Sequence, residues 1–172
     1  MLPNDVVQPA RAEHVERLAD IERAAARLLA GHAPAHVLRD TTTDSALRAA
    51  ANEGRLWVAT VDDAPVGFAL VDILAADLAH LEEVDVHPRH GQRGIGTALV
   101  REVCAWTRAA GFAQLTLTTF RAPRWNMPFY AGLGFVEVSR CDWRAELERV
   151  VANETARGLD PATRVVMVWR SR

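Results

Sequence analysis

Lysine is absent from this sequence of 172 residues, so all 20 basic side chains other than histidine are arginines. A P-loop needs a lysine after its glycines to reach the phosphates of a nucleotide, and the chain therefore has no P-loop. Cysteine is nearly absent as well, since only Cys104 and Cys141 occur. Two distant cysteines form neither a disulfide framework nor a zinc site, and we expect two reduced thiols.

Long apolar runs and an excess of positive charge are also missing. A membrane-spanning helix needs about 18 or more consecutive apolar residues, and no such run occurs. Residues 1–14 lack the basic segment followed by an apolar stretch that marks a secretory signal, so the expected location is the cytoplasm. The net charge of −2 argues against a nucleic-acid-binding surface. We therefore expect neither a membrane nor a nucleic acid as a partner.

The length and the composition, 49% hydrophobic and 24% charged, are typical of one globular domain spanning residues 1–172. The spacing of apolar residues predicts helices over 12–30, 45–52, 94–110, 126–133 and 142–157. It predicts strands over 55–61, 66–74, 79–86, 113–120, 135–139 and 163–169, with a short edge strand at 6–7. The order βααβββαβαβαβ predicts an α/β (α+β) fold. Its mixed sheet contains an early antiparallel hairpin and a parallel pair joined by a helix.

The most informative segment, residues 84–99, runs from a strand through a glycine-rich turn into a helix. Gly91, Gly94 and Gly96 allow positive φ angles and a close approach to a ligand. The turn leads to a helix N-terminus, where unpaired N–H groups and the helix dipole favour an anion such as a pyrophosphate. The spacing G-x-x-G-x-G differs from the G-x-G-x-x-G of a Rossmann turn. A purely structural strand-to-helix turn is the alternative.

This segment resembles the acetyl-CoA-binding signature of the GNAT superfamily of N-acetyltransferases, in the pattern V-x-V-x-P followed by G-I-G-T-A-L. Residues 126–135, which end in Tyr-x-x-x-Gly-Phe, are similar to a second signature of that family. One position departs from the pattern, because Gly91 stands where the family usually has Gln or Arg. The resemblance implies a mostly antiparallel central sheet in which one parallel pair of strands splays apart, flanked by helices.

The resemblance also implies acetyl-CoA as cosubstrate, without a metal ion. Backbone groups near the end of one strand would pair with the pantetheine arm: Val84, Asp85 and Val86. The pyrophosphate would be wrapped by Gln92, Arg93, Gly94, Ile95, Gly96 and Thr97. Asn126 would contact the cofactor near a short helix. Tyr130, the one tyrosine of the chain, matches the position that protonates the leaving thiolate, and simple packing of its helix is the alternative.

Three carboxylates crowd the strand at 79–86: Glu82, Glu83 and Asp85. Alternate residues of a strand share a face, so Glu82 lies with the two valines of the signature and opposite Glu83. If that face meets the acceptor, Glu82 is the base that deprotonates the acceptor amine, directly or through water. His80 is the alternative candidate for this base. A β-bulge in this strand would exchange the two faces. The alternative to a catalytic role is that these carboxylates lie on a solvated strand edge. Glu22, on the first helix, is expected on the exposed surface, with a place in the acceptor site as the alternative.

The resemblance implies transfer of an acetyl group from acetyl-CoA to a primary amine by direct attack. The amine belongs to a small molecule, or to the N-terminus or a side chain of a peptide or protein, and the loops at 31–44 and 120–126 would select it. The alternative is a non-catalytic acyl-CoA-binding or sensory domain with the same fold. His87 and His90 lack further ligands, so no metal is expected. A homodimer is one of the assembly states that the sequence allows.

Overall fold

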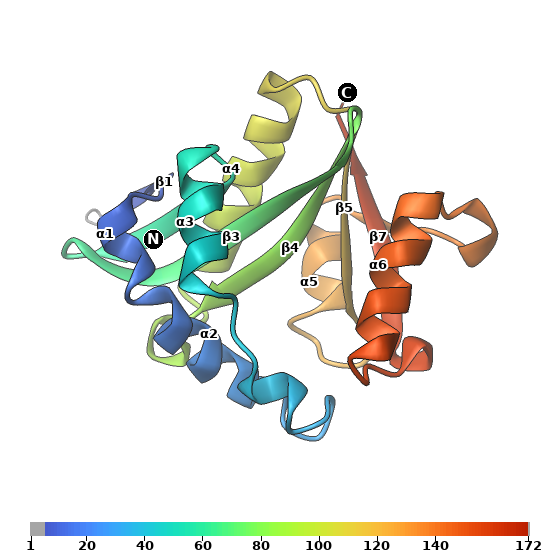
Figure 1. The fold of residues 1–172 in the computed structure, drawn as a ribbon, viewed down its shortest axis with the longest axis horizontal. Coiled ribbons are helices and arrows are strands. Elements are labelled where there is room, and N and C mark those ends of the chain that lie inside the picture. Colours follow the sequence, from blue (N-terminus) through green and yellow to red (C-terminus); the bar gives the residue numbers. More distant parts are fainter. Residues whose placement is uncertain (1–5, 172) are drawn as a thin grey trace.

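The computed structural model describes residues 6–171, which form a seven-stranded sheet with helices on both faces (Figure 1). The strands are β1 (Val6–Pro9), β2 (Leu56–Val61), β3 (Ala64–Ala75), β4 (Leu78–Val86), β5 (Gln114–Phe120), β6 (Val136–Glu137) and β7 (Arg164–Arg170). The helices are α1 (Ala12–Val15), α2 (Leu18–Ala26), α3 (Asp44–Asn52), α4 (Ile95–Ala109), α5 (Met127–Gly132) and α6 (Ala145–Ala156). No helix within residues 6–171 has the length and apolar character needed to cross a membrane.

The strand order is β1-β2-β3-β4-β5-β7-β6. Every neighbouring pair is antiparallel except β4 and β5, which are parallel and joined through α4. The predicted mixed, mostly antiparallel sheet with one parallel pair is therefore confirmed.

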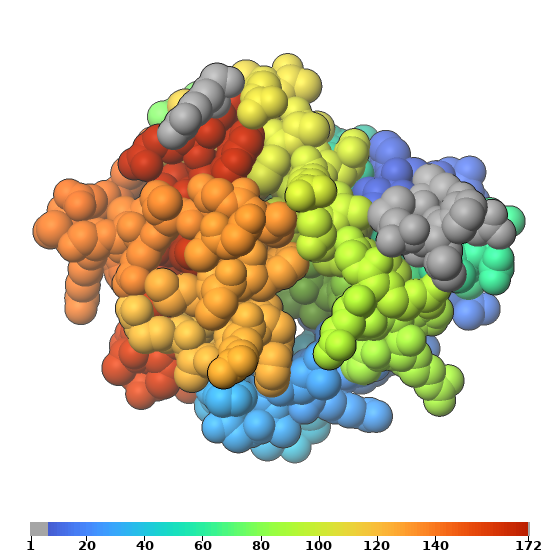
Figure 2. Space-filling view, turned by 180° about the vertical axis from the view of Figure 1, so that it is seen from behind, coloured from blue at the N-terminus to red at the C-terminus, as the bar shows by residue number. Residues whose placement is uncertain are grey.

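Helices cover the two faces of the sheet in separate apolar cores. Figures 1 and 2 show α4 and α5 on one face, and α1, α2, α3 and α6 on the other. On the first face α4 buries Ile95, Leu99 and Val103 against the middle of the sheet. On the other face Val15, Leu18 and Leu47 pack against Phe68 and Leu70 of β3. Helices thus pack against both faces of β2–β4, and this packing fixes the position of β4.

The single helix predicted over 12–30 is wrong in its extent. This segment forms α1, α2 and a 3₁₀ turn at Arg27–Leu29. Between the two helices the amide of Arg17 donates to the carbonyl of His14 (3.2 Å), a bond to the third residue back that tightens the chain locally. After α2 the side chain of Leu28 is 50% exposed, so its place in the apolar pattern does not mark a buried face.

The β4–β5 pair opens into a V (Figure 1). The two strands pair only where Leu78–His80 lie beside Gln114–Thr116, and they diverge beyond that point. β4 also carries a bulge, because Leu81 pairs with Val71 whereas Glu83 pairs with Leu70, so Glu82 is the extra residue. Bulges bend a strand and increase its twist. The bulge therefore accompanies the separation of β4 from β5.

The bulge also changes which residues of β4 share a face. Val84 and Val86 pack toward α4 together with Leu81, although strict alternation would separate them from it. The side chains of Glu83 and Asp85 consequently lie on the face of α2. Simple alternation, which groups Glu82 with the two valines, is wrong here, and the bulge alternative is the one observed.

Candidate active site

The turn between β4 and α4 presents backbone amides at the start of a long helix. β4 leads into a 3₁₀ turn at Pro88–His90, and the chain then takes positive φ angles at Gln92 (59°) and Gly94 (84°). Gly94 is the N-cap of α4, has no side chain to bond the first amides, and is followed by a first turn without acidic residues. The amides of residues 95–97 can therefore bind an anion, and this cradle fits a pyrophosphate.

The other two glycines of the turn have a different role from the predicted one. Gly91 has a φ of −60°, and Gly96 is helical, so the positive φ expected at both positions is wrong. A Cβ added to Gly96 would lie 3.6 Å from the ring of Phe129 and 3.8 Å from Val86. Gly96 thus keeps α4 close to both α5 and the end of β4.

We expect Gly94→Ala to weaken coenzyme A binding about tenfold, because a side chain at positive φ costs about 1–2 kcal/mol and shifts the turn that presents the amides. Isothermal titration measures the affinity. Gly111→Ala is the matched control, since Gly111 follows α4 at a φ of 82° with open space around it. Equal coenzyme A affinities in the two variants would contradict the assignment of this turn.

Tyr130 and Asn126 come from α5 and its N-cap. The Tyr130 ring makes edge contacts with Phe129 (centroids 5.0 Å apart) and Phe135 (5.8 Å). Burial and the nearby carboxylates of β4 raise the pKa of Tyr130, so its hydroxyl stays protonated at neutral pH. The side-chain amide of Asn126 donates to Thr119 of β5 (2.8 Å), and its Oδ1 is buried without a hydrogen-bond partner in the described residues. Both residues therefore offer hydrogen-bonding groups beside the opening of the V.

Three carboxylates meet on the α2 face of β4. Glu83 and Asp85 titrate as a coupled pair, and burial, followed by the charge of Glu22, raises the pKa of Asp85 to about 7. Burial and neighbouring carboxylates also hold the pKa of Glu83 well above its usual range. Like charges this close cannot all ionise, so the pair keeps a proton near neutral pH. The Oδ2 atom of Asp85 is buried and has no hydrogen-bond partner within residues 6–171.

Glu22 is buried, and its expected exposure is wrong. It is 8% exposed, and both carboxylate oxygens accept the amide hydrogen of Thr42 at 3.0 Å. Burial raises its pKa as well. The sequence gives no local signal for this, because the partner lies 20 residues away in a segment without periodicity.

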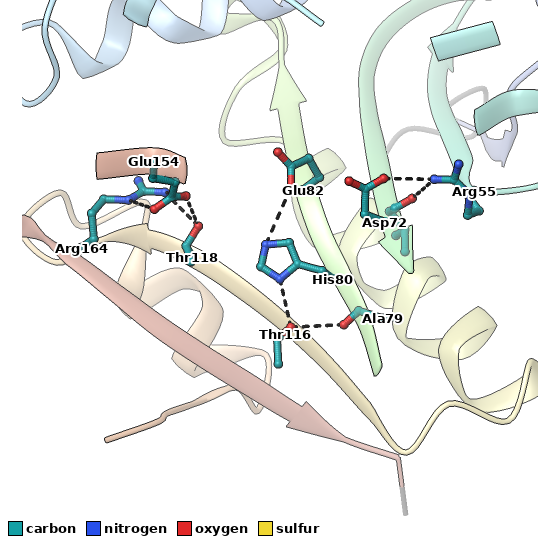
Figure 3. Close-up of polar contacts among 10 residues, drawn as sticks. Arg55, Asp72, Ala79, His80, Glu82, Thr116, Thr118, Glu154 and Arg164 are labelled. Carbon is teal, nitrogen blue, oxygen red and sulfur yellow. Dashed lines mark hydrogen bonds and ion pairs between the residues drawn. The ribbon is translucent and has the colours of Figure 1, made fainter. Parts of the chain in front are cut away.

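The sides of the V carry two polar networks (Figure 3). On β4, His80 is buried, its Nδ1 lies 3.0 Å from the Thr116 hydroxyl, and its Nε2 lies 3.9 Å from a carboxylate oxygen of Glu82. On the other side, Arg164 of β7 donates to Glu154 of α6 (2.7 Å).

This second network is partly buried and lies close to the first. Glu154 also accepts a hydrogen bond from Thr118 of β5, and Arg164 lies over the ring of Phe120 (4.5 Å). Glu154 and Arg164 both influence the pKa of Glu82, so they lie within electrostatic reach of β4. The sequence did not predict the Glu154–Arg164 pair, because no local sequence pattern indicates contact between a helix residue and a strand residue ten positions later.

The surface is hollowed between the end of β4 with its glycine turn and the segment containing α5 (Figure 2). The structure gathers most of the predicted residues around this opening. The predicted pyrophosphate residues lie at the start of α4, and Val84–Val86 form the unpaired edge of β4. Within residues 6–171, no group of three His, Cys, Asp or Glu side chains is arranged to hold a metal ion.

Comparison with known proteins agrees with this arrangement. The model of the acetyltransferase (GNAT) family matches residues 15–135. The fold is similar to the PaiA N-acetyltransferase of Thermoplasma acidophilum, solved in complex with coenzyme A. The two are 17% identical, with 96% of this chain and 98% of that chain covered and a TM-score of 0.75.

Two other solved structures share the fold. One is Rv2747 of Mycobacterium tuberculosis, solved in complex with CoA and NLQ (23% identity, 96% of this chain and 98% of that chain covered, TM-score 0.66). The other is the ribosomal-protein-S18-alanine N-acetyltransferase of Escherichia coli (18% identity, 97% and 94% covered, TM-score 0.64).

In this structure a splayed parallel pair of strands lies beside a glycine turn that can hold an anion. The chain belongs to the GNAT family of acetyltransferases, whose model covers well over half of it. Acetyl transfer is the class of reaction that this family and fold support.

Proposed function

We propose that the protein transfers the acetyl group of acetyl-CoA to the primary amine of a small, positively charged molecule. The observation that carries the proposal is the unpaired edge of β4, which leads from the amides of α4 to Glu82, with Tyr130 within electrostatic reach of Glu83 and Asp85 on the same strand. An extended pantetheine arm can pair with such an edge as an added strand. With the arm in that place, we expect the thioester to lie near the bulge of β4, within reach of Glu82 and Tyr130.

The chain's own residues can then account for the movement of protons. Glu82 takes one proton from the acceptor's ammonium group, which leaves a neutral amine to attack the acetyl carbon. As the carbon–sulfur bond breaks, Tyr130 donates its hydroxyl hydrogen toward the sulfur. The second proton lost by the nitrogen restores the tyrosine. The products are an acetylated amine, coenzyme A as the thiol, and one proton on Glu82.

The charges beside the V support a cationic acceptor. Buried Glu22 and the partly buried Glu83 and Asp85 form an acidic group, and Glu82 lies next to it on β4. Glu154 balances the positive charge of Arg164 on the far side. The carboxylates therefore attract an ammonium ion and stabilise it before the proton is removed.

A segment that crosses beneath the V supports a small acceptor over a protein. The loop at 31–43 extends from α2 toward the end of α6 (Figure 1). There the His36 Nε2 is 2.8 Å from the carbonyl oxygen of Arg157, and Asp40 is 3.8 Å from the Arg157 guanidinium. At the other end of the loop, the amide of Thr42 donates a hydrogen bond to Glu22. A loop held at both ends limits the size of an acceptor on this side.

Coenzyme A release with an amine panel tests the proposal. The panel contains butylamine, putrescine, spermidine and a short peptide with a free N-terminus. Acetylated putrescine, which has one free amine fewer than putrescine, serves as the control. We expect kcat/KM to rise with the number of positive charges and to be lowest for the peptide. Coenzyme A binding without turnover on any amine would instead support the sensory alternative.

A further inference from the structure

His80 lies where β4 and β5 part, at the last of the three positions at which they pair. It is 1% exposed, and burial lowers its pKa to about 4. The ring is therefore neutral at physiological pH, with a hydrogen on one nitrogen and a bare lone pair on the other. Which nitrogen carries the hydrogen determines what the ring presents to Glu82.

Thr116 decides between the two tautomers. Its hydroxyl oxygen lies 3.2 Å from the carbonyl oxygen of Ala79 and 3.0 Å from Nδ1 of His80. A carbonyl oxygen can only accept, so the one hydroxyl hydrogen goes to Ala79. The hydroxyl must then accept from His80, which places the ring hydrogen on Nδ1. The lone pair of Nε2 consequently points toward Glu82, whose nearer oxygen is 3.9 Å away.

This arrangement places two hydrogen-bond acceptors side by side when Glu82 is ionised. Once Glu82 has taken a proton, its O–H can donate to Nε2, either after a small rotation of the partly exposed carboxyl or through one water. His80 therefore favours the protonated form of Glu82, which is the form produced when a base removes a proton.

Charged groups on the other elements also act on Glu82. Burial, Asp72 of β3 and Glu154 of α6 raise its pKa, whereas Arg157 and Arg164 oppose the rise. On β4 itself the influence runs the other way, because the charge of Glu82 is one of the causes that raise the pKa of Glu83. These groups surround the carboxyl at longer range, whereas His80 offers it a hydrogen-bond acceptor at close range.

We propose that His80 is a positioning residue for the base, held by Thr116 as the Nδ1–H tautomer so that its Nε2 accepts a hydrogen bond from Glu82 once Glu82 has taken a proton from the acceptor. This inference rests on the proposed function, in which Glu82 is the base. No oxidant, metal or further reactant is needed, since the proton moves only from the ammonium group to Glu82 and into a hydrogen bond with His80.

Two threonine variants and one spectrum test the inference. Thr116→Val keeps the shape and removes the hydroxyl, so Nδ1–H loses its acceptor and the hydrogen is expected to move to Nε2, facing Glu82. An N–H aimed at the carboxylate stabilises its ionised form. We expect the acid limb of the kcat/KM profile to move to lower pH and the plateau to fall about tenfold, because the base is weaker. Thr116→Ser, which keeps the hydroxyl, should restore the wild-type profile.

Nitrogen-15 NMR of the histidine rings reads the tautomer directly, with His80→Gln to assign the signal. A wild-type His80 carrying its hydrogen on Nε2 would overturn the inference without any activity measurement. A tautomer switch in Thr116→Val that leaves the pH profile unmoved, or equal behaviour of the serine and valine variants, would overturn it as well. Unchanged coenzyme A affinity shows that each variant is folded. Failure of the wild type to acetylate any amine would refute the proposed function alone, because the tautomer is measured independently.

Discussion

Glu82→Gln is expected to lower kcat/KM by about 10²–10³-fold at neutral pH, because the amide cannot take the proton of the acceptor's ammonium group. The wild-type rate should fall as the pH drops and Glu82 becomes protonated. Burial and the neighbouring charge of Asp72 raise the pKa of Glu82, so this acid limb lies above the usual range of a glutamate. Steady-state rates of coenzyme A release across pH, with the best amine of the panel, measure both effects.

The acid limb attributed to Glu82 should disappear in the variant, and the remaining rate should depend on how much free amine is present. Glu148→Gln is the control, since it removes an exposed carboxylate from α6 away from the V. If the Glu82→Gln enzyme keeps the wild-type pH profile, Glu82 is not the base. The Glu83–Asp85 pair is then the next candidate, because it shares a proton and has a buried Oδ2 atom.

Tyr130→Phe is expected to reduce kcat about 10²-fold with little change in coenzyme A affinity. Phenylalanine keeps the ring contacts with Phe129 and Phe135, so the helix should remain in place. What is lost is the hydroxyl that donates to the departing sulfur. Its raised pKa, caused by burial and then by Glu83 and Asp85, keeps that hydroxyl protonated over the whole working range. Single-turnover rates and calorimetric titration with coenzyme A separate the two quantities.

The leaving group offers a sharper comparison for the same variant. A thiol that is more acidic than coenzyme A needs less help from a hydrogen-bond donor. The defect of Tyr130→Phe should therefore shrink with an acetyl thioester of such a thiol. A defect that is equal for both thioesters, or absent for both, would assign Tyr130 to packing.

Local chemistry was enough to predict the strands in their order and the glycine turn that leads into α4. Apolar residues spaced along residues 94–110 predict α4, and the glycines before it predict a turn, because both effects act over a few neighbouring residues. The bulge at Glu82 was only one of two alternatives, since it depends on how β4 registers with β3. The burial of Glu22 by Thr42 and the pairing of Glu154 with Arg164 depend on tertiary contacts, which no periodicity encodes.

The short ladder between β4 and β5 has a consequence for stability if coenzyme A binds beside it as proposed. Three paired positions leave most of one β4 edge without a strand. If coenzyme A fills that place as proposed, it binds the folded chain and not the unfolded one. Mass action then adds about 2.7 kcal/mol to stability at a ligand concentration a hundred times the dissociation constant. A cell poor in coenzyme A would therefore lose more of this protein to unfolding and proteolysis than a cell rich in it.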